Sequence, residues 1–460
     1  MLLRKKSHLS HISSHSWFRP WQRMDWLLFV LVVGVSLFGG LMIYSTELSY
    51  LRELSIGQIV SQIQAGELKV PKFLTHIIVA GVGAIIALIL AVLRYEHLQR
   101  IHWVSYGLTI ALLIAVEVLG KTELGAQRWF QIGFFRFQPS EFAKIFMIIT
   151  LASILHRTTA SSLSVVFRAL AITAVPWALI FKQPDLATSL VFGAIVLGML
   201  YWANANPGWL ILMISPIVAA ILLSIQWPFA LTLPGGLAFG ILGLIWAVAM
   251  GVVGWKTLPW QRFGIGGIGA WLMNMLGGEI GILIWKYVLK DYQKGRLISF
   301  LNPEADPLNS GYQQAQSRTA IGAGEWFGRG LSNGPMTQLN FVPEQHTDFI
   351  FSAVGEEFGF IGAIIMICVF ALICIRLLMI AQNAKDNFGS LLAIGTLSMI
   401  VFQTVVNIGM NVGLAPVAGI PLPWMSYGGT AMLTNFIALG IVESVNTFSP
   451  PPSKYRNLRY

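Results

Sequence analysis

Long runs of apolar residues follow one another along the chain, separated by polar segments. Each run holds about 20 residues, the length that an α-helix needs to cross a bilayer, whereas the strands of a membrane barrel would be short and alternating. The pattern therefore predicts twelve transmembrane helices. They span residues 26–45, 74–93, 102–119, 139–155, 168–182, 185–203, 208–226, 235–255, 266–288, 349–375, 390–414 and 427–448.

The composition agrees with this pattern. Of the 460 residues, 55% are hydrophobic and 11% are charged, and the mean hydropathy is +0.69. A soluble domain carries about 25% charged residues, so we expect an all-α, polytopic membrane protein. Its two cysteines, Cys368 and Cys374, lie within one apolar run. Thiols in such a place behave as small hydrophobes and predict neither a disulfide framework nor a metal site.

The chain is expected to form one transmembrane domain. This domain spans residues 26–448, after a basic segment 1–25 and before a Pro-rich, basic tail 449–460. The first apolar run begins near Asp25 and has no small-residue cleavage site, so we expect a retained helix and not a signal peptide.

The distribution of Lys and Arg predicts the orientation. A net charge of +10 would also fit a nucleic-acid partner, but in a membrane protein basic residues mark the cytoplasmic loops, so no nucleic acid is expected. With the N-terminus inside, the inner loops hold many basic residues and only three acids, Asp25, Glu96 and Asp386. Both termini are then cytosolic, and segments 46–73, 120–138 and 289–348 lie outside.

The outer segment GAQRWFQIGFFRFQPSEFAK (125–144) combines a helix start with cations. Pro139 suits a first helical turn, and Glu141 suits the positive end of the helix dipole. Lys144 falls about one turn inside the apolar helix, where a lysine is costly and usually faces a polar cavity or a partner. Arg128 and Trp129 fit either a functional site or an interfacial anchor, and the sequence leaves both open.

Two further outer segments carry acids with alternative roles. In KQPDLATS (182–189), Asp185 follows Gln183 and Pro184 and either caps the next helix or takes part in function. In ADPLNSGY (305–312), Asp306 precedes a strong turn signal and could simply cap that turn. The Gly-rich stretch 320–334 matches no phosphate-binding loop and predicts a surface loop.

The last outer segments crowd ionisable groups at a helix entrance. Acids there are ordinary dipole partners, and the HTD spacing is not that of a standard metal site. Five such groups still exceed what capping needs: Glu344, His346, Asp348, Glu356 and Glu357. The Pro- and Gly-rich hairpin 413–432, which contains Ser426, is tolerated at membrane depth where it lines a cavity or is buried in protein.

These groups all belong to the outer face or lie just beneath it. The cytosolic face has basic residues, but its sequence shows no comparable cluster and no nucleotide-binding loop. Cations and carboxylates at a membrane boundary suit an amphiphile whose anionic headgroup meets the cations while its tail stays in lipid.

The segments QRWFQIGFFRFQPSEFAKI, QPDLATS, DPLNSGYQQAQS, PEQHTDFIFSAVGEEFG and GIPLPWMSYGG together resemble the SEDS family (shape, elongation, division and sporulation). Their order and spacing cover nearly the whole chain apart from one insert. The stretch 290–330 is more similar to the elongation branch, RodA, than to the division branch, FtsW. The resemblance implies a SEDS fold and a peptidoglycan glycosyltransferase that polymerises lipid II outside the bacterial cytoplasmic membrane. It also implies a class B penicillin-binding protein and the MreB-associated elongation machinery as partners in rod-shape maintenance.

The resemblance assigns roles to single positions. The family's essential aspartate matches Asp306, and its functional Trp and basic positions match Trp129, Arg128 and Lys144. We extend the candidate substrate site to residues of the same motifs and outer segments, namely Gln183, Asp185, Gln316, Ser317, Glu344, His346, Asp348 and Ser426. The family usually has ten spans, so residues about 229–288 are interpreted as an inserted helix pair, which leaves the large loop 289–348 outside.

A chemical hypothesis follows from the resemblance. The 4-hydroxyl of an incoming lipid II attacks the anomeric carbon of the growing chain, and undecaprenyl pyrophosphate leaves with inversion. Asp306 is the candidate base, with metal binding as its competing role. Arg128 and Lys144 are candidates for the pyrophosphate, with Mg²⁺ or Mn²⁺ as the expected cofactor; no organic cofactor is expected. The rival interpretations are a lipid II flippase, an FtsW-like division polymerase and a non-catalytic scaffold.

Overall fold

The computed structural model describes residues 19–51, 71–123, 126–132, 135–158, 160–183, 185–224, 237–258, 264–301 and 310–450. Asp306 lies outside the described residues, as do the two ends of the chain.

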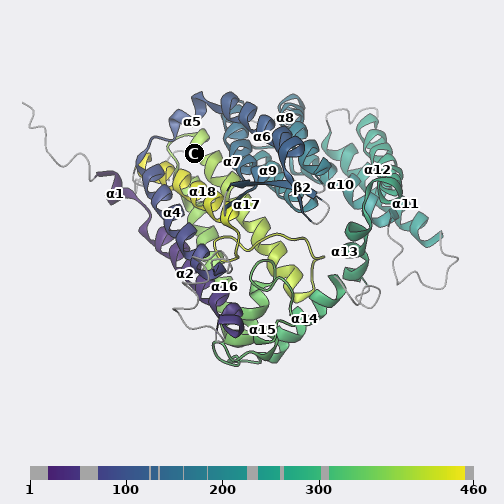
Figure 1. Cartoon of the computed structure of the whole chain (residues 1–460). Coiled ribbons are helices and arrows are strands. Elements are labelled where there is room, and N and C mark those ends of the chain that lie inside the picture. Colours follow the sequence, from purple (N-terminus) through teal and green to yellow (C-terminus); the bar gives the residue numbers. More distant parts are fainter. Residues whose placement is uncertain are drawn as a thin grey trace, which may run out of the picture.

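Twelve long helices form the body of the described part of the protein, and each corresponds to one predicted span (Figure 1). They are α2 (Trp26–Leu51), α4 (Lys72–Val92), α6 (His102–Leu119), α7 (Pro139–Leu155), α8 (Leu163–Lys182), α9 (Leu186–Trp202), α10 (Pro207–Ser224), α11 (Leu237–Thr257), α12 (Ile265–Leu283), α16 (Ile350–Asn383), α17 (Asn387–Val412) and α18 (Gly429–Phe448). Eight helices in the described ranges are long and apolar enough to cross a membrane, and α9, α10 and α11 add shorter apolar helices. The predicted all-α, polytopic architecture is confirmed.

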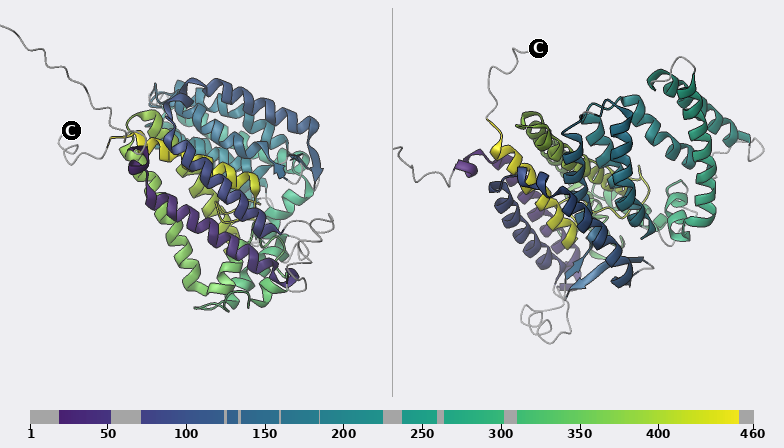
Figure 2. Two further views of the ribbon diagram at one scale, coloured as in Figure 1. Left: turned by 60° about the vertical axis from the view of Figure 1, so that its left-hand side comes forward. Right: turned by 90° about the horizontal axis from the view of Figure 1, so that it is seen from above.

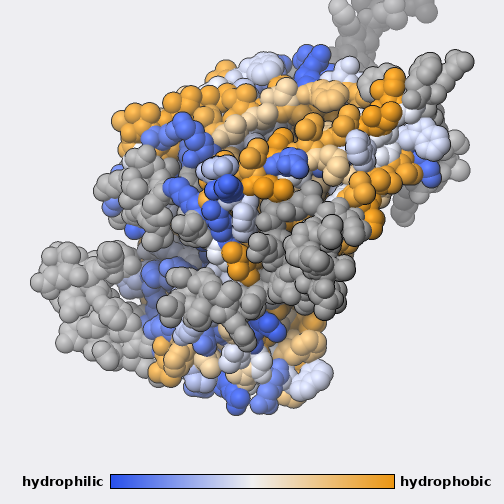
Figure 3. Space-filling view, turned by 90° about the vertical axis from the view of Figure 1, so that its right-hand side faces the viewer, coloured by the Kyte–Doolittle hydropathy of each residue, from blue (hydrophilic) through white to orange (hydrophobic). Residues whose placement is uncertain are grey.

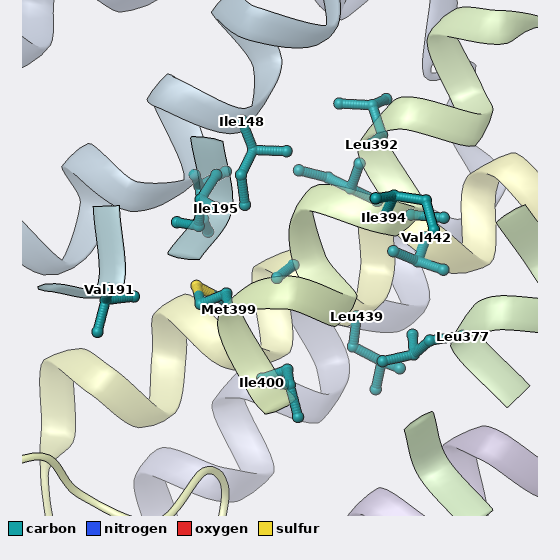
Figure 4. Close-up of a cluster of buried hydrophobic side chains, with 14 of the residues drawn as sticks. Ile148, Val191, Ile195, Leu377, Leu392, Ile394, Met399, Ile400, Leu439 and Val442 are labelled. Atoms are coloured by element: carbon teal, nitrogen blue, oxygen red, sulfur yellow. The ribbon is translucent and has the colours of Figure 1, made fainter. Parts of the chain in front are cut away.

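Helix α17 lies at the centre of the bundle and packs against α7, α9, α16 and α18. Figure 4 shows Ile148 of α7, Ile195 of α9 and Leu439 of α18 gathered around residues of α17. Helices α17 and α18 are also the most buried of the eight candidate spans, at 61% and 72%. A Cβ on Gly440 of α18 would lie 2.8 Å from the Cα of Ala87 in α4, so a glycine allows these two helices to approach closely.

The surface of the bundle is apolar where a soluble protein would be polar. On α4, the exposed side chains Ile78, Val82, Ile85 and Ile89 follow helical spacing, with 47–59% of each side chain exposed. Hydrophobic residues gather over much of the upper part of one face in Figure 3. Patches of this extent are stable only against an apolar environment such as lipid.

The helix pair α11 and α12 lies to one side and packs on α10 (Figures 1 and 2). It has its own small core of Leu212, Met250 and Ala270. A buried amide supports it, since Asn274 Nδ2 donates to Ser215 Oγ at 3.0 Å and Asn274 Oδ1 accepts from Trp246 Nε1 at 3.1 Å. This pair coincides with the predicted helices of the 229–288 insert and continues into the π-helix η2 (Ile284–Val288).

The polar segments contain more regular structure than the sequence predicted. A three-stranded antiparallel sheet consists of β1 (Lys121–Glu123), β2 (Ala126–Ile132) and β3 (Phe135–Phe137). The pairs Thr122–Gln127 and Gln131–Arg136 set its register. The large loop contains α13 (Asp291–Leu301), α14 (Ser310–Ala323) and α15 (Pro335–Gln338), while α1 (Arg19–Arg23) and α5 (Glu96–Arg100) lie at the opposite end of the bundle. Such segments satisfy backbone groups that would otherwise lack partners.

Helix α16 is longer than its predicted span of 349–375 and is broken inside. Gly359 has φ 67° and ψ −165°, a conformation that is open to glycine and closed to L side chains. A Cβ there would also lie 2.3 Å from the amide nitrogen of Gly328. The first two turns of α16 are therefore a separate buried segment beneath residues 324–334, and the predicted surface loop is packed against them.

Candidate active site

The first group of candidate residues joins the sheet to the start of α9. Arg128 on β2 donates from Nε to the carbonyl oxygen of Gln183 at 2.9 Å, and its Nη1 lies 4.0 Å from Asp185 Oδ1. Asp185 is buried and accepts from the amide of Thr188 at 3.2 Å. Asp185 therefore caps α9 and also faces the Arg128 guanidinium, so both roles considered from the sequence are present.

Gln138 connects this group, although sequence reasoning did not select it. Its Nε2 donates to Asp185 Oδ2 at 3.2 Å and to Ser140 Oγ at 3.0 Å, and its Oε1 accepts from Trp129 Nε1 at 3.2 Å. The indole N–H of Trp129 is thus used within the protein, and the half-buried ring is held in one orientation. No sequence signal marks Gln138 beyond its place before Pro139.

Lys144 forms a buried ion pair just inside α7. Its Nζ lies 2.8 Å from Glu141 Oε2, and the two side chains are only 1% and 7% exposed. The structure therefore gives Lys144 a partner, and Glu141 does more than favour the helix dipole. The i,i+3 spacing of the two residues is a signal that could have indicated the pair from sequence.

A second group surrounds His346, before the start of α16. Lys72 Nζ lies 2.8 Å from His346 Nε2, and Glu344 Oε2 lies 3.8 Å from the same nitrogen. A lysine ammonium only donates, so His346 Nε2 must accept and the ring is neutral. Burial, and then the charge of Lys72, lower the pKa of His346 to about 4, although Glu344 acts in the opposite direction.

This pKa predicts the effect of His346→Gln on acid stability. Unfolded His346 takes up a proton below its ordinary value of 6.5, whereas the native ring stays neutral down to about pH 4. Stability contributed by the neutral ring is therefore lost as the pH falls through this window. Between about pH 7 and about pH 5, we expect the wild type to lose about 2 kcal/mol relative to His346→Gln, since one pKa unit corresponds to about 1.4 kcal/mol.

The measurement is the free energy of unfolding in detergent at the two pH values. His97→Gln changes an exposed histidine of α5 and is the matched control, for which a smaller difference is expected. Parallel pH profiles for the wild type and His346→Gln would contradict the assignment of a neutral, buried ring.

Asp348 and Arg296 join the large loop to the start of α16. Burial raises the pKa of Asp348 to about 6, although the positive charge of Arg296 opposes the shift. Arg296 Nη1 also donates to the carbonyl oxygen of Ala418 at 3.3 Å. The backbone carbonyl of Asp348 accepts from Asn407 and Asn411 of α17 at 2.9 and 3.0 Å. These hydrogen bonds fix the backbone of Asp348 against α17.

Residues 413–430 bring the two groups together. The amide of Tyr427 donates to the carbonyl oxygen of His346 at 2.9 Å, and Thr430 Oγ1 accepts from the amide of Gln138 at 3.2 Å. Thr430 Oγ1 also donates to the carbonyl oxygen of Arg136 at 2.6 Å. Three residues span at most about 11 Å, so the His346 and Arg128 groups lie at the same end of the bundle and close to each other.

The same segment anchors the helices on both sides of Asp306. Arg296 of α13 reaches Ala418, and Gln314 Nε2 of α14 donates to the carbonyl oxygen of Ala415 at 2.9 Å. The hydroxyls of Ser299 and Ser310 lie 2.8 Å apart, which joins α13 to the start of α14. The described helices α13 and α14 thus lie beside residues 413–430.

The side chains of several other predicted site residues form hydrogen bonds within the protein. Ser317 Oγ donates to the carbonyl oxygen of Asn411 at 2.9 Å, and Ser426 Oγ accepts from the amide of Leu422 at 2.8 Å. The side chain of Gln183 points to the carbonyl oxygen of Leu113 at 2.9 Å, so only its backbone faces Arg128. Gln316 is half-buried on α14.

The two remaining acids near the start of α16, Glu356 and Glu357, have partners outside the His346 group. Glu356 accepts from the amides of Met336 and Thr337 at 2.8 Å and so caps α15. Glu357 contacts Ser45 of α2. In the described part of the chain, no three His, Cys, Asp or Glu side chains are grouped to hold a metal ion.

Sequence reasoning missed Gln138, Lys72, Arg296 and Thr430, which join segments far apart in the chain. Lys72 and His346 are separated by 274 positions and Gln138 and Thr430 by 292. No spacing rule connects residues at such distances.

Comparisons with known proteins identify the family of the chain. The family model for FtsW, RodA and SpoVE, described as "Cell cycle protein", matches residues 25–232 and 238–450. The chain is 34% identical over 446 residues to "Peptidoglycan glycosyltransferase RodA" of Treponema pallidum (strain Nichols), covering 92% of this chain and 97% of the relative. It is 34% identical over 350 residues to "Peptidoglycan glycosyltransferase MrdB" of Escherichia coli (strain K12), covering 76% and 78%.

Solved structures show the same fold. A chain from a structure described as "Structural coordination of polymerization and crosslinking by a peptidoglycan synthase complex" matches with a TM-score of 0.64 at 24% identity, covering 92% of this chain and 97% of that one.

Proposed function

The chain belongs to the FtsW, RodA and SpoVE family of cell cycle proteins, and we propose that it is a peptidoglycan glycosyltransferase that polymerises lipid II during cell elongation. It is an integral membrane protein. One observation carries the proposal. Charged groups from β2, α4, α13, the start of α9 and the segment before α16 meet at one end of the bundle, around residues 413–430 and beside the helices that flank Asp306.

The reaction joins two lipid-linked sugars. The 4-hydroxyl oxygen of one substrate forms a bond to the anomeric carbon of the other, and the bond from that carbon to the pyrophosphate oxygen breaks. Asp306 takes the hydroxyl proton, and the pyrophosphate leaves with the electron pair of the broken bond. Such general-base help typically contributes about 10²–10⁴-fold to the rate.

The described residues suit the binding of the leaving group. Arg128 is held by Gln183 and Asp185, so its guanidinium is fixed before a substrate arrives, which reduces the cost of ordering it. The ring of Trp129 is oriented beside it by Gln138 and offers a flat apolar surface to a sugar or an isoprenoid. Lys144 lies one turn inside α7, with its charge offset by Glu141.

The proposed site also binds a divalent cation, although none of the bond changes described above depends on it. Mg²⁺ is usually held by one or two carboxylates together with substrate phosphates, so Asp306 and the pyrophosphate would supply its ligands. Bound there, Mg²⁺ or Mn²⁺ would neutralise charge on the leaving pyrophosphate.

The distribution of charge supports an orientation of the protein in its membrane. We place the protein in the bacterial cytoplasmic membrane, with both termini in the cytosol and the candidate active site outside, because the short loops at the other end of the bundle hold many basic residues and only three acids, Asp25, Glu96 and Asp386. A class B penicillin-binding protein of the elongation machinery is the proposed partner. The structural relative described as part of a peptidoglycan synthase complex supports this choice.

The test is polymerisation of fluorescent lipid II by the purified protein, with and without its penicillin-binding partner and with Mg²⁺, Mn²⁺ or chelator. We expect glycan chains to form, and we expect their formation to require an active complex with the partner or a divalent cation. Absence of polymer under every condition would overturn the proposal, and movement of lipid II across vesicle membranes without polymer would favour a flippase instead.

A further inference from the structure

A cavity of about 360 Å³ lies at the end of the bundle opposite the candidate active site. It is bounded by the α1–α2 junction, the last turns of α16 and the end of α18, which lie together at the end where the chain leaves α18 (Figure 2). Its lining combines two arginines, one aspartate, three amide side chains and a serine with a few apolar residues. None of these residues has a role in the proposed transfer reaction.

One wall of the cavity is fixed by a buried ionic network. Arg376 Nε and Nη2 lie 2.8 and 2.6 Å from Asp25 Oδ2. Asp25 Oδ1 accepts from the amide of Leu28 at 3.1 Å, and the Asp25 amide donates to Glu443 Oε2 at 2.9 Å. The Arg376 side chain is nevertheless 28% exposed, so part of a rigidly held guanidinium faces the cavity.

The remaining charge of the lining is positive. Arg23 is exposed, and no hydrogen bond or ion pair of its guanidinium is found among the described residues. Its backbone carbonyl accepts from Asn446 Nδ2 at 2.9 Å, which fixes the position from which the side chain extends. Among the residues that line the cavity, Asp25 offsets Arg376, so Arg23 leaves one net positive charge beside polar amide and hydroxyl groups, which favours an anion.

The cavity lies at the depth where lipid headgroups are expected. The rings of Trp21 and Trp26 stack at 6.5 Å beside the α1–α2 junction, and Trp26 Nε1 donates to the carbonyl oxygen of Trp21 at 2.9 Å. Such Trp side chains mark the membrane–water interface. Immediately beyond, α2 and α16 expose apolar side chains, with Val30 61% and Ile375 53% exposed.

We propose that this cavity binds the headgroup of an anionic glycerophospholipid. The phosphate lies between Arg23 and Arg376, the glycerol oxygens meet the amides of Asn383 and Asn446, and the acyl chains follow the exposed faces of α2 and α16. A peptide or a free phosphate would use the polar lining but would leave the adjoining apolar faces without a role. Arginine is well suited to the site because its planar fork matches phosphate oxygens.

The experiment compares Arg23→Gln with the wild type in the full-length, purified protein. Arg23 is exposed, so this change leaves the buried Asp25–Arg376 pair intact and should not impair folding. The melting temperature is measured while dioleoyl phosphatidylglycerol or dioleoyl phosphatidylcholine is added to the detergent, since a ligand of the native state raises it. We expect phosphatidylglycerol to stabilise the wild type more than phosphatidylcholine, and Arg23→Gln to lose at least half of that difference.

Arg100→Gln is the matched control, because Arg100 is exposed at the same end but does not line the cavity. It should keep the full preference for phosphatidylglycerol. Equal stabilisation by both lipids, or an unchanged preference in Arg23→Gln, would overturn the proposal. If soluble glycerol phosphate reproduced the whole effect, the site would take a free phosphate and the lipid assignment would be wrong.

Discussion

Asp306→Asn is expected to abolish glycan synthesis in the purified lipid II assay while leaving the protein folded in the membrane. The amide keeps the shape of the carboxylate but can neither accept the hydroxyl proton as a base nor bind a cation strongly. Loss of a general base lowers the rate by about 10²–10⁴-fold, and loss of a metal ligand would add to this. The yield and length of labelled glycan chains are the measurement.

Glu325→Gln is the matched control. Glu325 is a carboxylate at the end of the bundle that holds the candidate active site. It is 74% exposed and forms a surface pair with Arg329 at 3.4 Å, so the same chemical change should leave polymerisation unaltered. A normal yield from Asp306→Asn would rule out the base role and the metal role together. It would favour a scaffold for the penicillin-binding protein.

Lys144→Met is expected to cause the second large effect, a loss of both stability and activity. Removing the ammonium leaves Glu141 as an uncompensated charge in a site that is 7% exposed. Breaking a buried ion pair from one side costs about 3–5 kcal/mol. Thermal or denaturant unfolding of the purified protein measures the loss of stability, and the lipid II assay measures the loss of activity.

The double variant Glu141→Gln, Lys144→Met separates the two losses. Without either charge, the stability should return towards that of the wild type, because neutral residues of similar volume often replace a buried pair at little cost. The activity should stay low if Lys144 contributes charge to pyrophosphate binding. An active double variant would show that the pair serves folding alone.

An ion pair on the surface provides a reference for the loss of stability that is expected when the buried pair is broken. Lys385 and Glu96 lie 3.5 Å apart, with side chains 54% and 31% exposed. Lys385→Met should cost at most about 1 kcal/mol, because exposed pairs contribute little.

Local sequence patterns were sufficient for the helical framework. A transmembrane helix satisfies its backbone groups within one segment and is selected by a continuous apolar run, so each of the twelve helices could be predicted from its own residues. The cap at Asp185 was also predictable, since capping depends on the next few residues. The Lys144–Glu141 pair could have been predicted, because both residues belong to one turn of helix.

The arrangement of the site could not be read in this way. Gln138, Lys72 and Arg296 act through partners that are far away in sequence, and the break at Gly359 depends on residues 324–334 packed against it. The importance of Asp306 came from resemblance, whereas the placement of its flanking helices came from contacts with residues 413–430. Hydrophobicity and hydrogen bonding along one segment specify a helix locally, but polar side chains at a membrane boundary find their partners only after the helices have packed.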